Sequence, residues 1–234
     1  MGGTRPYRSG LREAQAAATR ARILDAAAGE FSERGFAGTT LGVIATTAGV
    51  SVETVKLQGA KHELLLAAWE QQLGSPKNQS AFLDDAGFRA MTMEIPDETL
   101  VSTLAEQAAD ISRRGHGLWL ALTAAAQTDE SLRAEVESQQ SRRLREFGLV
   151  IDEFARRSLL RIDRSKADLA VGLAFLASSE GYNELVNRSG FSHDQYRDWL
   201  ADAITRLITR PSPRPVGTGA NTESSHHESD YSDR

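Results

Sequence analysis

Three groups of residues are of types that perform catalysis or bind metals. Asp84 and Asp85 are possible general acids or bases, and the run Ser178-Ser179-Glu180 offers a nucleophile. No histidine lies near either group in the sequence to act as a base, and no Gly-x-Ser-x-Gly or phosphate-loop motif occurs. The segment 226–230 holds histidines and acids, but a tail without a third fixed ligand is a poor metal site. We therefore predict no enzyme activity, no catalytic residue, no bound metal and no cofactor.

Length and composition indicate an ordinary globular chain. The 234 residues correspond to one or two domains, and 40% hydrophobic with 25% charged residues is unlike a disordered protein. The absence of cysteine excludes disulfides, thiolate nucleophiles and cysteine-ligated metal sites. No apolar run approaches the roughly 18 residues of a membrane span, and the N-terminal segment lacks the apolar core of a signal peptide. We expect a cytoplasmic protein that does not enter a membrane.

Charge is distributed unevenly along the chain. The formal net charge is -5, which argues against a protein that coats nucleic acid nonspecifically. Residues 1–24 nevertheless contain five arginines and one acid, a charge of +4, so the remainder of the chain sums to -9. A polyanion is therefore expected to meet the N-terminal end first.

Proline positions and residue types predict an all-α fold. Residues 97–210 contain no proline and are rich in the amino acids that favour helices. No run alternates polar with β-branched or aromatic residues between turn dipeptides, as a half-buried strand would. The predicted helices span about 18–34, 41–48, 61–73, 82–91, 97–114, 117–127, 129–160, 164–187 and 192–209, with a further short helix that begins after the Ser51 cap.

A helix-turn-helix is predicted directly after the first of these helices. Thr39 or Thr40 caps a short helix whose apolar positions end at Gly49. After a turn, Ser51 caps a second short helix with Glu53 in its first turn, where the helix dipole favours an acid. In such a motif the second helix can enter the major groove of DNA.

Two sets of residues carry a resemblance to a known family. The first set is Ile23-Leu24-Asp25-Ala26-Ala27, Phe31, Thr39-Thr40, Ile44-Ala45, Ala48-Gly49-Val50-Ser51 and Glu53-Thr54-Val55. In order and spacing it resembles the DNA-binding domain of the TetR family of bacterial transcriptional repressors, over about residues 20–70. The second set, Ser179 to Val186, Gly190-Phe191-Ser192, Tyr196 and Trp199 to Asp202, resembles the two C-terminal helices of one actinobacterial-type branch.

The resemblance implies a homodimer joined through its last two helices. Its N-terminal domain would bind double-stranded DNA at a palindromic operator, and its C-terminal bundle would bind a small, hydrophobic effector that releases the DNA. The expected divisions are a flexible basic arm at 1–17, a helix-turn-helix domain at 18–74, an effector-binding and dimerisation domain at 75–210, and a disordered tail at 211–234.

The resemblance also implies roles for single residues. Thr40, the amides that begin the second helix, and Lys61 would bind phosphate. Thr54, Glu53 and Gln58 are candidates for base edges, with Glu53 accepting from a cytosine amino group and Gln58 pairing with adenine. Arginines of the first helix would add sequence-independent attraction. The predicted DNA-binding residues are Arg20, Arg22, Thr39, Thr40, Ser51, Val52, Glu53, Thr54, Lys56, Gln58, Lys61 and His62.

Three positions depart from the family pattern. Lys56 stands where an aromatic residue usually contacts a phosphate, Gly59 where a core phenylalanine is usual, and His62 where lysine is usual. Lys56 can serve a phosphate as a cation, whereas Gly59 must change the local packing. The alternative is a helical ligand-binding or interaction protein whose degenerate helix-turn-helix does not read DNA, with an enzyme as a more distant third.

Aromatic residues of the bundle are candidates for a ligand pocket, and the last helix for an interface. Trp119, Phe147, Phe154 and Phe175 either line an effector pocket or pack as ordinary core. The last helix has an apolar stripe wider than one neighbour requires, so we expect it to contact a second chain as well. The predicted dimer-interface residues are Tyr182, Leu185, Tyr196, Trp199, Leu200, Ala203, Ile204 and Leu207.

Overall fold

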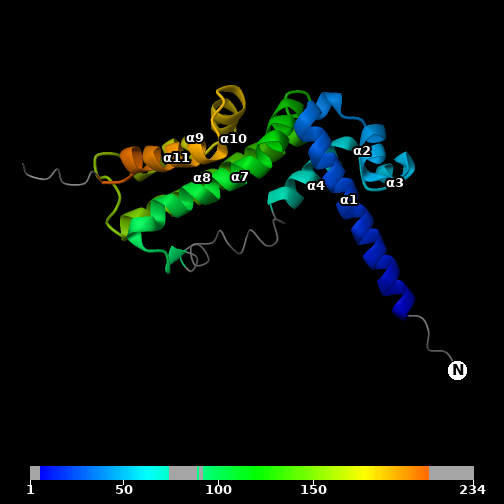
Figure 1. Ribbon diagram of the computed structural model, residues 1–234, viewed down its shortest axis with the longest axis horizontal. Coiled ribbons are helices and arrows are strands. Elements are labelled where there is room, and N and C mark those ends of the chain that lie inside the picture. Colours follow the sequence, from blue (N-terminus) through cyan, green and yellow to red (C-terminus); the bar gives the residue numbers. More distant parts are fainter. Residues whose placement is uncertain (1–5, 74–88, 90–91, 211–234) are drawn as a thin grey trace, which may run out of the picture.

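The computed structural model describes residues 6–73, 89 and 92–210, and the regular elements within them are helices (Figure 1). The described residues form no β-strand, and their β-type pairing is a single antiparallel bridge between Leu160 and Thr209. The all-α prediction is confirmed. None of the described helices has the length and apolar character needed to cross a membrane. The predicted helix at 82–91, apart from residue 89, and the tail from residue 211 lie outside the described residues.

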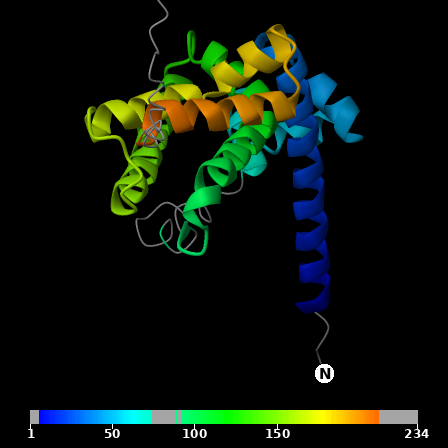
Figure 2. The ribbon, with the colours of Figure 1, turned by 60° about the vertical axis from the view of Figure 1, so that its left-hand side comes forward.

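The first helix, α1 (Pro6–Gly38), begins well before the predicted residue 18. Residues 6–17, expected as a flexible arm, are therefore helical, which follows from their alanines, arginines and glutamate. This half of α1 projects away from the other helices in Figures 1 and 2, and residues 12–18 are exposed. At the other end Gly35, with φ 67° and ψ 178°, interrupts the helix at the predicted stop.

Three helices complete the N-terminal part at the predicted positions. They are α2 (Leu41–Ala48), α3 (Val52–Lys56) and α4 (Lys61–Leu73). Helix α1 packs on α2 and α4, and α3 packs on α2. Their buried side chains form one cluster that includes Phe31, Ile44, Val55 and Leu65. Helix α3 joins this cluster through Val55.

The next helix, α7 (Asp97–Ala125), is one continuous element where two were predicted. We expected a boundary near Gly117, because glycine disfavours helix interiors. A Cβ atom at Gly117 would lie 2.7 Å from the Cβ of Ser32 on α1. Gly117 therefore allows two helices to approach closely and does not end either of them.

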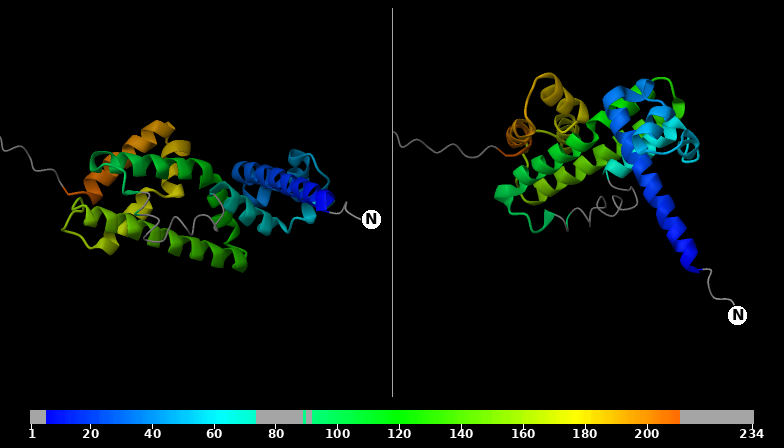
Figure 3. Two further views of the ribbon diagram at one scale, coloured as in Figure 1. Left: turned by 90° about the horizontal axis from the view of Figure 1, so that it is seen from below. Right: turned by 45° about the vertical axis from the view of Figure 1, so that its right-hand side comes forward.

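Helix α7 belongs to two hydrophobic clusters. Its C-terminal part, from Leu118 to Ala125, joins the cluster of the N-terminal helices. Its N-terminal part, from Leu100 to Ala109, joins a second cluster with α8 (Glu130–Arg156), α9 (Lys166–Leu176) and α11 (His193–Ile208). Figure 3 shows the blue and cyan N-terminal helices at one end, the yellow and orange C-terminal helices at the other, and the green helices between them. The first cluster thus extends past the predicted boundary at residue 74.

The C-terminal segment is more broken than the predicted helix at 164–187. After α9 the chain turns into α10 (Ser179–Tyr182) and a π-helix, η1 (Asn183–Arg188). The break occurs because Ser178 Oγ accepts the Gly181 N–H at 2.9 Å and caps a new helix. Helix α11 begins with a capping box of Ser192 and Gln195, as its predicted start requires.

Candidate DNA-binding surface and bundle cavity

Side-chain caps fix the start of both short helices of the helix-turn-helix. Thr40 Oγ1 accepts the Val43 N–H at 3.2 Å, and Gly49, with φ 66°, ends α2 in the left-handed conformation. Ser51 Oγ accepts the Thr54 N–H at 3.1 Å and lies 2.9 Å from Thr54 Oγ1. The predicted limits of the motif are confirmed, and the turn between its helices sets the direction of α3.

Helix α3 buries one side and exposes the other. Val55 is fully buried and Val52 is half-buried against the cluster, so these side chains anchor the helix. Glu53 and Lys56 are exposed, and Thr54 is half-buried beside Ser51. The polar side chains predicted to meet DNA therefore lie mostly on the solvent side, whereas the Val52 side chain faces the protein.

Arg20 and Gln58, both predicted to contact DNA, contact each other. Arg20 Nη1 donates to the Gln58 carbonyl oxygen at 3.3 Å and to Gln58 Oε1 at 3.2 Å. The contact ties α1 to the chain just after α3. Arg22 lies exposed on α1.

Thr39 and Lys61, predicted to contact DNA, donate hydrogen bonds to backbone carbonyl oxygens within the domain. Thr39 is fully buried, and its hydroxyl donates to the carbonyl oxygens of Glu30 at 3.0 Å and Gly35 at 2.8 Å. Lys61 Nζ donates to the carbonyl oxygens of Phe36 at 2.9 Å and Thr39 at 3.1 Å. It also lies 4.1 Å from the centre of the Phe36 ring. The interruption of α1 at Gly35 leaves carbonyls that need donors, and these two side chains supply them.

His62 is oriented toward the bundle. It is half-buried on α4, close enough to Asp129 for its charge to act on that carboxyl. Hydrogen bonds from the Ser131 hydroxyl and the Leu132 N–H lower the pKa of Asp129, and His62 adds to this in the same direction. Asp129 caps α8, so His62 lies near the start of that helix.

Leu57 is an exposed residue for which the sequence predicts no role. It directly follows α3, and 84% of its surface is accessible. A leucine near a predicted helix suggests core packing, although Leu57 does not share the helical spacing of Val52 and Val55. That mismatch is the signal that could have revealed it.

Gly59 shapes the turn into α4. Its φ is 140°, and a Cβ atom there would lie 2.8 Å from Glu63 Oε2, the atom that accepts the Ala60 N–H at 2.7 Å. The turn therefore requires glycine where the family pattern has an aromatic residue.

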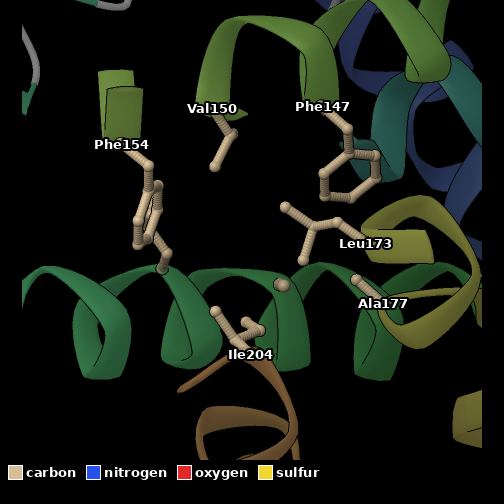
Figure 4. Close-up of a pocket in the computed structure, with 8 residues that line it drawn as sticks. Phe147, Val150, Phe154, Leu173, Ala177 and Ile204 are labelled. Atoms are coloured by element: carbon tan, nitrogen blue, oxygen red, sulfur yellow. The ribbon is translucent and has the colours of Figure 1, made fainter. Parts of the chain in front are cut away.

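A small apolar cavity lies inside the second cluster (Figure 4). Its volume is about 50 Å³, enough for a few waters and too little for a drug-sized ligand. Helices α7, α8, α9 and α11 all contribute to its wall. The lining residues are Leu104, Ala108, Phe147, Val150, Phe154, Leu173, Ala177 and Ile204.

Two of the four predicted pocket residues lie elsewhere. Phe147 and Phe154 line the cavity, as predicted. Trp119 packs against Trp69 of α4, with ring centres 5.4 Å apart, and its Nε1 donates to Glu180 Oε1 at 2.7 Å. Phe175 is 77% exposed on the outer side of α9. Sequence periodicity cannot choose between two cores that share α7, which explains the error for Trp119.

Helix α11 carries an inner and an outer apolar row. Tyr196, Leu200 and Ile204 are buried in the second cluster, as is Tyr182, whose ring meets that of Tyr196 edge-on. Burial raises the pKa of Tyr196 to about 12. Leu185 and Ala203 are half-buried. Of the predicted interface residues, Trp199 and Leu207 expose large apolar surface; Phe175 and Val171 on the adjoining α9 do so too.

One group in the described residues has metal-ligating types close together. Glu106, Asp110 and His193 place one ligand atom each within 4.8 Å of one another. Both carboxylates already pair with arginines, Glu106 with Arg197 at 3.3 Å and Asp110 with Arg113 at 2.8 Å. The group is therefore accounted for as an ion-pair network between α7 and α11.

A capped helix-turn-helix beside an apolar helical bundle defines a helix-turn-helix DNA-binding protein. Residues 23–58 match the sequence model of the bacterial regulatory proteins of the tetR family. The helix-turn-helix of this chain is therefore similar to the DNA-binding domain of that family.

Solved structures share the fold over most of the chain. A transcriptional regulator from Saccharomonospora viridis in complex with choline has 21% identity and a TM-score of 0.64, covering 83% of this chain and all of that one. NalD of Pseudomonas aeruginosa, the secondary repressor of the MexAB-OprM multidrug efflux pump, has 24% identity and a TM-score of 0.57, covering 83% and 98%. FadR of Bacillus subtilis in complex with stearoyl-CoA has 15% identity and a TM-score of 0.60, covering 80% and 98%. No curated protein matches the sequence.

Proposed function

We propose that the chain is a transcriptional repressor that binds a palindromic operator as a homodimer and leaves it when a small molecule fills the bundle cavity. The observation that best supports DNA binding is α3, which is held by buried Val55 and turns Glu53 and Lys56 outward. In this proposal the amides that begin α2 and the Thr40 hydroxyl bind one phosphate, and Lys56 binds another.

Three exposed or half-exposed side chains at α3 suit base edges. Glu53 can accept a hydrogen bond from a cytosine amino group, and the Gln58 side chain can pair with adenine once Arg20 turns to a phosphate. Leu57 offers an apolar surface for a thymine methyl group. Arg22 on α1 adds attraction that does not depend on sequence.

The DNA-binding part is tested by selecting bound sequences from a random duplex pool and titrating the winning site at several salt concentrations. We expect a palindrome whose half-sites lie about one helical turn apart. Lys56→Met should weaken binding to all sequences alike and reduce the salt slope by about 2, because each of the two subunits loses one phosphate contact. Leu57→Ala should relax the preference at one base pair.

The matched control is Lys166→Met on α9. Lys166 is 59% exposed and pairs with Asp152 far from the helix-turn-helix, so operator affinity should not change. If no sequence is enriched from the pool, or if the two lysine variants bind the operator with equal affinity, the alternative of a helix-turn-helix that does not read DNA is favoured.

The dimer part of the proposal rests on the outer apolar rows of α9 and α11. Val171, Phe175, Trp199 and Leu207 expose between 37% and 77% of their surface on helices that pack together. A patch of this kind suits a self-complementary contact between two copies of the chain.

Phe175→Asp tests this contact by sedimentation velocity without DNA. The variant should be monomeric, because the charge would be buried in the interface, while its helical content stays unchanged. Leu57→Asp places the same charge at a residue of similar exposure at the other end of the molecule and should remain dimeric. A wild-type protein that sediments as a monomer contradicts the proposal.

The effector part rests on α7, which links the cavity to the DNA-binding end. Leu104 and Ala108 of α7 line the cavity, and Trp119 of the same helix packs on Trp69 of α4. The similar structures from S. viridis and B. subtilis hold choline and stearoyl-CoA, respectively. A ligand larger than the cavity would displace α7 and change the spacing of the two α3 helices. A ligand bound in the bundle that leaves operator affinity unchanged would refute this coupling.

A further inference from the structure

A guanidinium group stands at one end of the apolar cavity. Arg143 lies one turn before Phe147 on α8, and its guanidinium carbon is 5.5 Å from the centre of the Phe147 ring. Its Nη2 donates to the carbonyl oxygens of Ala174, at 3.1 Å, and Ala177. Phe147 and Ala177 both line the cavity, at the right in Figure 4 and opposite Phe154. Arg143 therefore contacts two residues of the cavity wall.

Part of this guanidinium has no partner within the described residues. The N–H groups on Nε and Nη1 make no hydrogen bond there, although Arg143 is half-buried. The side chains that line the cavity are all apolar. The cavity itself thus offers hydrocarbon, and a molecule that extends past Phe147 and Ala177 would meet strong hydrogen-bond donors.

The charge of Arg143 is already offset by its surroundings. Burial lowers the pKa of Arg143, while Glu180, Tyr196 and Glu146 raise it. Burial also raises the pKa of Glu146. Glu180 and Glu146 weaken the attraction of the guanidinium for an added carboxylate, and an added cation would be repelled by the guanidinium. An uncharged acceptor gains the hydrogen bonds without either cost.

We infer that the bundle binds an uncharged apolar molecule with one carbonyl-type acceptor, which Arg143 holds at the Phe147 end of the cavity. The inference rests on the proposed function, because it names the class of the effector. Arg143 also joins α8 to the carbonyls that end α9, the helix that carries Phe175. A bound acceptor would compete for the guanidinium and loosen that end of α9.

Four probes of similar size test the class on the full-length protein by isothermal titration calorimetry. They are acetophenone, which is neutral with a carbonyl, ethylbenzene, benzoate and benzyltrimethylammonium. We expect acetophenone to bind roughly tenfold more tightly than ethylbenzene, the effect of a hydrogen bond from a charged donor. Benzoate and benzyltrimethylammonium should bind more weakly than acetophenone.

Arg143→Met should remove the advantage of acetophenone over ethylbenzene while leaving ethylbenzene affinity nearly unchanged. Arg145→Met is the matched control, since Arg145 is exposed on the same helix, and it should keep the tenfold preference. If Arg143→Met does not fold, the order of the four probes on the wild-type protein still decides the matter.

Tightest binding of benzoate or of the cation, equal binding of acetophenone and ethylbenzene, or no binding by any probe would each overturn the inference. Operator selection is measured without probes, so its failure would refute the proposed function separately. If the protein binds its operator but the order of probe affinities differs from the expected one, the proposed function stands and the proposed effector class is refuted.

Discussion

Thr39 and Thr40 are neighbours with the same side chain and opposite surroundings. Thr39 is fully buried and donates to two carbonyl oxygens of α1, whereas Thr40 is exposed and caps α2. The family resemblance assigns both to DNA, and the sequence alone allows either to cap α2. Only the kink at Gly35, which creates the unpaired carbonyls, separates their roles.

Replacing each threonine by valine tests this separation. Thr39→Val should lower the free energy of unfolding by about 1–2 kcal/mol by leaving buried carbonyls without donors, with operator affinity of the folded protein unchanged. Thr40→Val should cost about 1 kcal/mol through loss of the cap and should also weaken operator binding. Urea denaturation and a DNA-binding titration of both variants measure the two effects. Equal losses of operator affinity would contradict the assignment.

Other single residues show what the sequence can and cannot reveal. The caps Thr40 and Ser51 were predictable, because their types and spacing act through local hydrogen bonds. The contacts of Lys61 and Trp119 could not be predicted, because their partners lie 22 or more residues away along the chain. Long-range partners depend on how helices cross, which residue spacing does not report.

At the scale of helices, the sequence predicts which helices exist better than it predicts where each one begins and ends. The positions of α2, α3 and α4 follow from caps and glycines, whereas the N-terminal half of α1 was taken for an arm because of its charge. The continuous α7 was missed because Gly117 looks like a boundary when the helix that crosses it is unknown.

Two glycines of long helices should respond oppositely to alanine. Gly29→Ala on α1 meets no atom within 4 Å and should stabilise the protein by about 0.5–1 kcal/mol through helix propensity. Gly117→Ala should destabilise it by about 1–3 kcal/mol, because the new methyl group meets Ser32 at 2.7 Å. Thermal denaturation of both variants, with Ser32→Gly added to Gly117→Ala as a rescue, gives the comparison. Stabilisation by Gly117→Ala would show that α1 and α7 separate without cost.

At the scale of the whole molecule, stability in acid depends on one buried carboxylate. Glu153 is 4% exposed and accepts hydrogen bonds from Arg156, at 2.6 and 2.8 Å, and from Arg157, at 2.6 Å. Arg157 also binds the carbonyl oxygens of Thr92 and Ile95, so this group holds the start of α7 against α8. Arg156 above all lowers the pKa of Glu153 to about 2.

A folded-state pKa below the ordinary 4.5 gives Glu153 a stabilising effect that is complete above about pH 4.5 and lost as the pH falls toward 2. Glu153→Gln should cost roughly 3 kcal/mol at pH 7 and flatten the fall in unfolding free energy across that range. Urea denaturation at a series of pH values measures both effects. Asp152→Asn, which breaks a half-exposed pair with Lys166, should cost less than about 1 kcal/mol. Parallel pH curves for wild type and Glu153→Gln would refute the role of Glu153.

The membership of α7 in both hydrophobic clusters has a consequence for how the molecule melts and how it can be cut. The two clusters share one continuous helix, because Leu100 to Ala109 serve one and Leu118 to Ala125 the other. Loss of structure in either cluster therefore removes the packing of half of a helix that the other cluster also needs. Heating should therefore give a single cooperative calorimetric transition. A fragment ending at residue 73 would leave Trp69 without Trp119. An exchange of DNA-binding specificity between such proteins must carry the C-terminal half of α7 along with the helix-turn-helix.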